Sequence, residues 1–264
     1  MIVLPIRIKL SIVLILTALL SAGLIAHVHW LNGPEYWKWP WRHVPAARWY
    51  PPMLLAAAPL LLVASFARLR NIFALPLLMI SMLGLQIAAA AMPESPPGLR
   101  RLIYTIESPS NTSYFADADR SMDIPIAQLL HDYPRLMPQF QMHSQEKPPG
   151  PILFFRAILA MFGPSDRTAL IAALTIAALA TLAIPATYLL ISVLTKQPGA
   201  ALFGAMFIAL SPGLVLHLPQ MDQLYPIFTA ALIIAWHRAL SQNSSLWRAL
   251  WFITSSFWAH FSQD

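Results

Sequence analysis

Residues 169–194 read ALIAALTIAALATLAIPATYLLISVL and contain no charged side chain. As a helix this run is about 39 Å long, enough to cross the roughly 30 Å hydrocarbon core of a bilayer. Similar apolar runs of about 17–25 residues recur along the chain, which has 264 residues, of which 58% are hydrophobic and only 11% are charged. This pattern predicts an all-α polytopic membrane protein.

We expect about seven membrane spans, at about Leu10–Ala26, Pro52–Ala67, Ile72–Met92, Ala169–Leu194, Ala200–Leu218, Tyr225–Trp236 and Leu246–Phe261. The longest stretch that is not an apolar run, Tyr104–Arg167, holds seven of the eleven acidic residues. Within it, Pro151–Gly163 is apolar but only about 20 Å long as a helix, too short to span. This segment therefore predicts a helix that lies flat at the membrane interface.

These features divide one integrated membrane domain into N-terminal spans (1–92), an outer loop with interfacial helices (93–167) and C-terminal spans (168–264). With the N-terminus in the cytoplasm, every carboxylate falls outside, and the cytoplasmic turns contain only the cations Arg7, Lys9, Arg68, Arg70, Lys196, Arg238 and Arg248. This distribution predicts a multi-pass protein of the plasma or inner membrane whose site faces outward. The net charge of +6 then fits anionic lipid headgroups rather than nucleic acid, and the absence of cysteine excludes thiolate chemistry.

On this topology three acidic points meet on the outer face. The first is Asp117 with Asp119 in YFADADR, the second is Glu146 beside Lys147 in HSQEKPPGP, and the third is Asp222 in LHLPQMDQLYP. A carboxylate can take a proton from an acceptor hydroxyl, and a cation can stabilise a departing phosphate. The residue types therefore suit transfer from a lipid-linked phosphate donor.

The segment His143–Leu190 resembles the core of the GT-C superfamily of membrane glycosyltransferases, in particular its family 39-like group of protein mannosyltransferases and aminoarabinose transferases. In that group a [HK]-P-P motif follows the first large outer loop and leads into a short interfacial helix and a Gly–x–Ser turn. The matching positions here are Lys147–Pro148–Pro149, residues 151–163 and Gly163–Pro164–Ser165. The next span in that group ends in Tyr–Leu–Leu, which matches Tyr188–Leu189–Leu190. A Ser–Pro near the end of the following span and an Asp at its outer end match Ser211–Pro212 and Asp222. The resemblance covers about Ser108–Arg238, roughly half of the chain.

The resemblance implies an inverting transfer of a sugar from a polyprenyl-phosphate carrier to a hydroxyl on a lipid, glycan or protein acceptor. It makes Asp117, or Asp119, the general base, and it gives Asp222 a role in orienting the acceptor or holding a divalent ion. Neither spacing nor composition demands a metal, so no cofactor is assigned and a divalent cation stays open. The expected substrate-binding residues are Tyr114, Arg120, His143, Lys147 and Arg156, and Lys147 with Arg120 or Arg156 would stabilise the leaving phosphate.

Each of these residues also has a structural interpretation. Asp117 and Asp119 suit a solvated loop or a helix cap, Lys147 an ordinary interfacial turn, Asp222 a cap on the next helix, and His143 a plain loop position. Two other functions remain open. A transporter component is disfavoured because the charges lie outside the spans, whereas a non-catalytic scaffold or an inactive piece of a transferase fits the same sequence.

Overall fold

The computed structural model describes residues 15–16, 18–23, 26, 28, 48, 50–57, 71–93, 96–109 and 111–242. The chain divides into two compact units, Met1–Pro45 and Ala46–Asp264. Every element in the described residues is a helix or a turn, which confirms the all-α class for this part of the chain. Three predicted spans lie partly or wholly outside the described residues, at Leu10–Ala26, Pro52–Ala67 and Leu246–Phe261.

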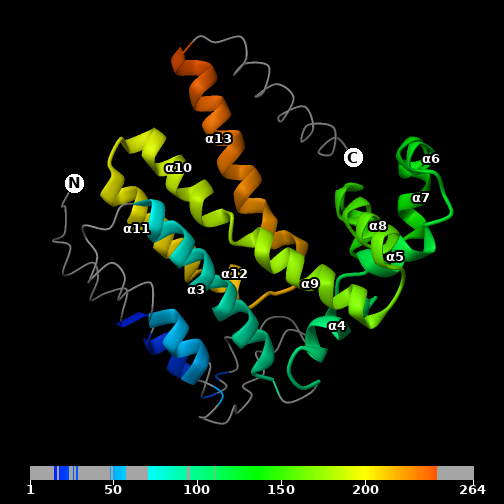
Figure 1. Ribbon diagram of the computed structural model, residues 1–264, viewed down its shortest axis with the longest axis horizontal. Coiled ribbons are helices and arrows are strands. Elements are labelled where there is room, and N and C mark those ends of the chain that lie inside the picture. The colour runs from blue at the N-terminus through cyan, green and yellow to red at the C-terminus, as the bar shows by residue number, and fades with distance from the viewer. Residues whose placement is uncertain are drawn as a thin grey trace. The chain divides into compact units, whose positions relative to one another are not determined.

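From residue 71 onward the second unit is a succession of helices and short 3-10 turns (Figure 1). In chain order they are α3 (Asn71–Ala91), α4 (Arg100–Glu107), α5 (Tyr114–Arg120), α6 (Ile126–His131), α7 (Tyr133–Leu136), η2 (Met137–Gln139), η3 (Ser144–Glu146), α8 (Gly150–Phe162), α9 (Asp166–Ala180), α10 (Ala183–Thr195), α11 (Pro198–Ala209), α12 (Pro212–Val215), η4 (Met221–Leu224) and α13 (Tyr225–Gln242).

Within the described residues, three segments are long and apolar enough to cross a membrane: Phe73–Ala91, Asp166–Thr195 and Met221–Ser241. They coincide with the third, fourth and sixth expected spans. The second of them joins α9 to α10 and begins at the N-cap Ser165, whose Oγ accepts a hydrogen bond from the Thr168 backbone N–H at 3.2 Å. This cap satisfies one of the free N–H groups at the helix start.

The fifth expected span is not one helix. α11 has 12 residues and is therefore about 18 Å long, short of the hydrocarbon core. The chain then breaks at Ser211, whose backbone is extended (φ −61°, ψ 122°), before α12 begins at Pro212. Proline lacks an N–H and disfavours helical backbone at the preceding residue, which explains why continuous apolar sequence from 200 to 218 gives two helices.

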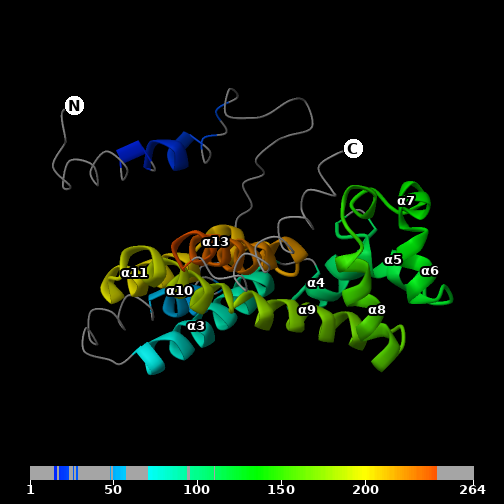
Figure 2. The same ribbon diagram turned by 90° about the horizontal axis from the view of Figure 1, so that it is seen from above.

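Small residues let the apolar helices pack closely. In the buried face of α11, Ala201, Ala205 and Ala209 recur at every fourth position and are at most 1% exposed. α10 packs against α11 and α13, and α11 also packs against α3 (Figures 1 and 2). Such small-residue faces allow close backbone approach where there is no large hydrophobic driving force between helices.

The polar stretch folds into the short helices α4 to α8, near the N-terminal end of α9 (Figure 2). Its core centres on Phe155 of α8, which is fully buried. The Tyr114 ring stacks on it with centroids 6.5 Å apart, and the Phe115 ring meets it edge-on at 5.8 Å. Burying a side chain such as Phe155 stabilises the fold by about 1.5–3 kcal/mol, so α5 and α8 are held as one packed body.

The helix expected at 151–163 is confirmed as α8, which follows directly after the Lys147–Pro148–Pro149 motif. It ends at Gly163, where φ is +70°, a conformation that glycine adopts without steric cost. Its placement flat on a membrane, the outward face of the loop and the total of seven spans stay predictions.

Candidate functional site

The candidate site is built where the start of α5 meets the segment that leads to Lys147. Ser113 and Ser144 lie with their Oγ atoms 3.2 Å apart, and the Ser144 backbone N–H donates to the Ser113 Oγ at 3.2 Å. Both serines are fully buried. These bonds join two parts of the polar stretch that are 31 residues apart, and they fix the backbone just before the Lys147 motif.

Asp117 belongs to the same joint. Its side chain is 1% exposed, its Oδ2 accepts a hydrogen bond from the Gln141 backbone N–H at 3.0 Å, and its Oδ1 lies 3.9 Å from Arg120 Nη1. With its amide oxygen turned toward the guanidinium, Gln141 also accepts from Arg120 at 2.9 and 3.1 Å. The Asp117 carboxylate is thus occupied in holding α5 to this segment. Asp119 is exposed, and two residues along a helix place it on a different face of α5.

Lys147 and Asp222, 75 residues apart in sequence, come together at the end of this segment. The Tyr133 hydroxyl donates to the Lys147 carbonyl at 2.9 Å and fixes the backbone. The Lys147 Nζ then lies 3.5 Å from Asp222 Oδ1 and 5.4 Å from the centre of the Tyr225 ring. The Lys147 side chain is 30% exposed and that of Asp222 is 56% exposed, so solvent or a ligand can reach the pair.

The electrostatics of this site keep Lys147 charged. Burial works to lower the pKa of Lys147, but the Asp222 carboxylate and the neighbouring Tyr225 outweigh burial, and the pKa lies above its ordinary value. Burial, with a smaller contribution from Asp222, raises the pKa of Tyr114. Burial, followed by the Asp117 charge, raises the pKa of Tyr133 to about 12. Both tyrosine hydroxyls are therefore protonated and able to donate at neutral pH.

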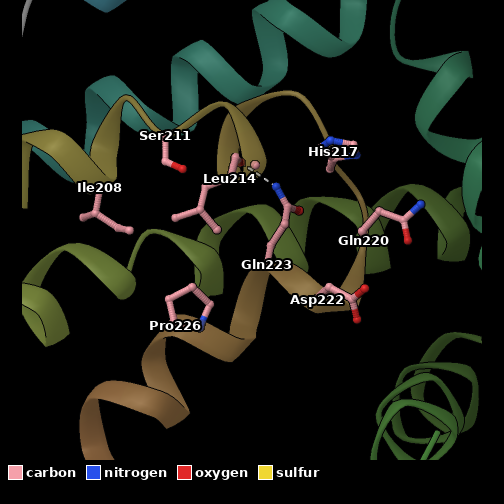
Figure 3. A pocket seen from close by; sticks show the side chains of 9 residues that line it. Ile208, Ser211, Leu214, His217, Gln220, Asp222, Gln223 and Pro226 are labelled. Carbon is pink, nitrogen blue, oxygen red and sulfur yellow. Dashed lines mark hydrogen bonds between the residues drawn. The ribbon is translucent and has the colours of Figure 1, made fainter. Parts of the chain in front are cut away.

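Asp222 also lines a pocket of about 420 Å³ between the end of α11, α12 and η4 (Figure 3). The other lining residues are Ile208, Ser211, Gly213, Leu214, His217, Gln220, Gln223 and Pro226. The lining combines apolar side chains with hydroxyl, imidazole, amide and carboxylate groups. The volume falls within the roughly 300–1,000 Å³ of small-molecule sites.

The remaining expected substrate-binding residues have other surroundings. Arg156 is 6% exposed, and its Nη2 donates to the backbone carbonyls of Met122 at 3.2 Å and Ile124 at 2.6 Å, so it holds the loop between α5 and α6. Arg120 is exposed and engaged with Asp117. His143 is half-buried directly before η3, and Tyr114 is buried within electrostatic reach of Asp222.

Among the described residues, no three His, Asp or Glu side chains gather in a metal-binding group, and the partner of Asp222 is a lysine.

Sequence reasoning did not single out Tyr133, Tyr225 or the pocket residues Gln220 and Gln223. The available signal for the two glutamines was the polar segment QMDQ (residues 220–223), which lies between Leu218–Pro219 and Leu224–Tyr225.

Comparisons with known proteins find no matching family model, no matching curated protein and no matching solved structure. The resemblance to the GT-C group therefore rests on the order of its short sequence motifs. Among the described residues, the Lys147–Asp222 pair and the pocket beside it are the strongest candidates for a functional site.

Proposed function

We propose that this chain is a membrane glycosyltransferase of the GT-C type, which moves a sugar from a polyprenyl-phosphate donor to a hydroxyl acceptor on the outer face of the membrane. The observation that carries the proposal is the Lys147–Asp222 pair at 3.5 Å, beside a pocket of about 420 Å³. It supplies a cation for a phosphate and a carboxylate for a hydroxyl proton at one exposed place. The three membrane-length helices support a lipid-linked substrate.

The proposal gives the role of general base to Asp222 rather than to Asp117. Asp117 is buried, and its carboxylate is bonded to the Gln141 backbone. Asp222 is more than half exposed and lines the pocket, so an acceptor hydroxyl can approach it. Asp117 then acts as a positioning residue, because it fixes the segment that carries Lys147.

In the proposed reaction the Asp222 carboxylate takes the proton of the acceptor hydroxyl, and the acceptor oxygen forms a bond to the anomeric carbon of the donor. The bond between that carbon and the phosphate oxygen breaks, and its electron pair leaves on the polyprenyl phosphate. The Lys147 ammonium stabilises the charge that develops there. Attack in line with the leaving group inverts the anomeric configuration.

This reaction requires the Lys147–Asp222 pair to separate, because in-line attack places base and phosphate on opposite sides of the anomeric carbon. A partly exposed ion pair contributes only about 0–1 kcal/mol. A bound phosphate can therefore replace Asp222 as the partner of the Lys147 ammonium at a small cost in free energy. The same exchange frees the Asp222 carboxylate for the acceptor.

The test is transfer of radiolabelled sugar from polyprenyl-phosphate donors to endogenous acceptors, in membranes that contain the chain. Lys147→Met and Asp222→Asn are each expected to remove transfer while the amount of inserted protein stays constant. Asp119→Asn is the matched carboxylate control on an exposed face of α5 and should transfer normally. Transfer retained by Asp222→Asn but lost by Asp119→Asn would show that the base is misassigned. No transfer by the unmodified chain would reject the proposal and favour a non-catalytic scaffold.

A further inference from the structure

Two buried glutamine side chains meet at one backbone carbonyl beside the pocket. Gln86 of α3 donates through Nε2 to the Leu214 carbonyl at 2.8 Å, and Gln223 of η4 donates to the same oxygen at 2.5 Å. Gln86 is fully buried and Gln223 is 2% exposed. Among the described residues neither side-chain oxygen has a hydrogen-bond partner. A buried acceptor without a donor costs about 1–3 kcal/mol, so a ligand group that donates to one of these oxygens would gain binding free energy.

The two glutamines differ in what their oxygens can reach. Gln223 lines the pocket, as Figure 3 shows, whereas Gln86 is not among the lining residues. Of the two side chains, only that of Gln223 is therefore placed at the wall that a ligand in the pocket contacts. The convergence on Leu214 also fixes the Gln223 amide, because its nitrogen is turned toward the carbonyl and its oxygen is the atom left over.

We propose that this pocket is a binding site for a neutral molecule with several hydroxyl groups, and that Gln223 Oε1 accepts a hydrogen bond from one of them. Ser211, His217, Gln220 and Asp222 surround the same space with further donors and acceptors, while Ile208, Leu214 and Pro226 cover an apolar face. This combination suits a ring that carries hydroxyl groups around an apolar face. Only the identification of this ligand with the acceptor rests on the proposed function.

Charge argues for a neutral ligand. No Lys or Arg is among the lining residues, and the one carboxylate there belongs to Asp222, so the lining itself offers an anion no cation to pair with. A cation gains little, since the Asp222 carboxylate already lies 3.5 Å from the Lys147 ammonium. A hydroxyl group can donate to Gln223 Oε1 or to Asp222 without adding charge.

The experiment measures binding to the purified full chain in lipid nanodiscs by ligand-detected NMR, with a methyl hexopyranoside as the probe. A trideoxy analogue of the same glycoside and the anionic hexonate are the comparison probes. The glycoside is expected to bind saturably, and each comparison probe about tenfold more weakly or not at all. Absence of saturable binding, or equal binding of the trideoxy analogue, would overturn the proposal.

The deciding variants are Gln223→Leu and Gln86→Leu. Each leaves the Leu214 carbonyl with one amide donor, because the other glutamine remains, so neither should lower stability. Gln223→Leu is expected to weaken glycoside binding about tenfold, and Gln86→Leu to leave it within about twofold. Equal weakening by both would show that the glutamines only support the helix break.

A third variant fills the pocket instead of changing its chemistry. A Cβ added at Gly213 would meet only the Ser211 Oγ, at 3.9 Å, so the first side-chain carbon has room there. In Gly213→Val the two further methyl groups should occlude the site. Glycoside binding that survives Gly213→Val would place the ligand elsewhere and overturn the proposal. Binding without sugar transfer would reject the proposed function alone. Transfer with an unchanged acceptor KM in Gln223→Leu would reject this inference alone.

Discussion

Two apolar runs follow one another on either side of Lys196 and fold differently. Residues Asp166–Thr195 form one 30-residue segment of membrane length, in which α9 and α10 meet at a tight turn. Residues 198–218 break at Ser211 into α11 and α12. Both runs contain prolines: Pro185 lies in the first turn of α10, where a missing N–H is tolerated, whereas Pro212 follows a residue in extended backbone.

The two runs differ in how their backbone hydrogen bonds are satisfied, and this difference places polar side chains among apolar helices. We call Asp166–Thr195 the unbroken run, because only the turn at residues 181–182 separates α9 from α10 and the backbone bonds continue across it. Leu182 donates to the Leu179 carbonyl at 2.9 Å, and Ile184 to the Thr181 carbonyl at 3.0 Å. The break leaves the Leu214 carbonyl to be bonded by two glutamine side chains, as buried backbone groups in an apolar medium require. The residues that follow the break turn Gln220, Asp222 and Gln223 toward one pocket. The broken run thus positions the candidate site, and the unbroken run supports it.

The largest expected effect concerns the acid that follows the broken run. Asp222→Asn removes the proposed base and should lower the transfer rate by about 10²–10⁴-fold. Asp166→Asn is the matched change in the first turn of the unbroken run and should cost only about 0.3–1 kcal/mol of stability through the helix dipole. Initial transfer rates at equal protein amounts give the comparison, and equal losses in both variants would contradict a special role for the break.

The next prediction concerns a proline introduced into the unbroken run. Ala177 is fully buried in α9, and Ala177→Pro removes a helix hydrogen bond and makes the proline ring clash with the carbonyl one turn earlier. This should destabilise the chain by about 3 kcal/mol or more. The control Pro185→Ala restores an N–H in the first turn of α10 and should leave stability nearly unchanged. Thermal unfolding in detergent micelles measures both, and tolerance of Ala177→Pro would mean that the continuity of α9 is not important.

The third prediction concerns a substitution that should make the broken run one continuous helix. Pro212→Ala removes the restriction on Ser211 and lets α11 continue toward Val215, which moves the Leu214 carbonyl and the pocket wall. Because misplacement by about 1 Å can lower a rate a hundredfold, we expect transfer to fall by about tenfold to a hundredfold. Hydrogen exchange of residues 210–214 should become slower as the new helix forms. Slower exchange with full transfer would show that the break is not needed for the site.

The smallest effect concerns the tether of Lys147. Tyr133→Phe removes the hydrogen bond to the Lys147 carbonyl and should cost about 0.5–1.5 kcal/mol. Burial raises the pKa of Tyr133 from 10.0 to about 12, so its contribution to stability is complete below pH 10 and is lost as the pH rises through 12. The Phe variant should therefore lose less stability over this window. Thermal unfolding at both ends of it is the measurement, with the exposed Tyr104→Phe as the control.

Much of the described fold follows from local sequence. Apolar length predicted spans at Ile72–Met92, Ala169–Leu194 and Tyr225–Trp236, because a chain that buries its backbone groups in an apolar medium must bond them within each helix. Helical segments of membrane length lie at these places, at Phe73–Ala91, Asp166–Thr195 and Met221–Ser241. The short helix α8 was equally predictable from the sequence, since Pro148 and Pro149 end the preceding loop. The break at Ser211 was the exception, because hydropathy counts apolar side chains and takes no account of the missing proline N–H.

The candidate site was predictable in its residue types but not in its pairings. The sequence singled out Lys147 and Asp222 separately, and their contact depends on Tyr133 and Tyr225, which hydropathy and motifs do not connect to them. The resemblance favoured Asp117 or Asp119 as the base, and the sequence shows no partner for either carboxylate. The fold gives Asp117 one, the Gln141 backbone N–H.

The sequence by itself determined the helical class, the long apolar segments and the presence of cations and carboxylates in one polar stretch, because these depend on composition and on spacing within about one helix turn. The tertiary structure alone decided that Asp117 is buried, that Asp222 meets Lys147, and that Gln223 faces a pocket. Burial and pairing are set by segments that lie 24 to 75 residues apart, and only their packing brings them within hydrogen-bond distance.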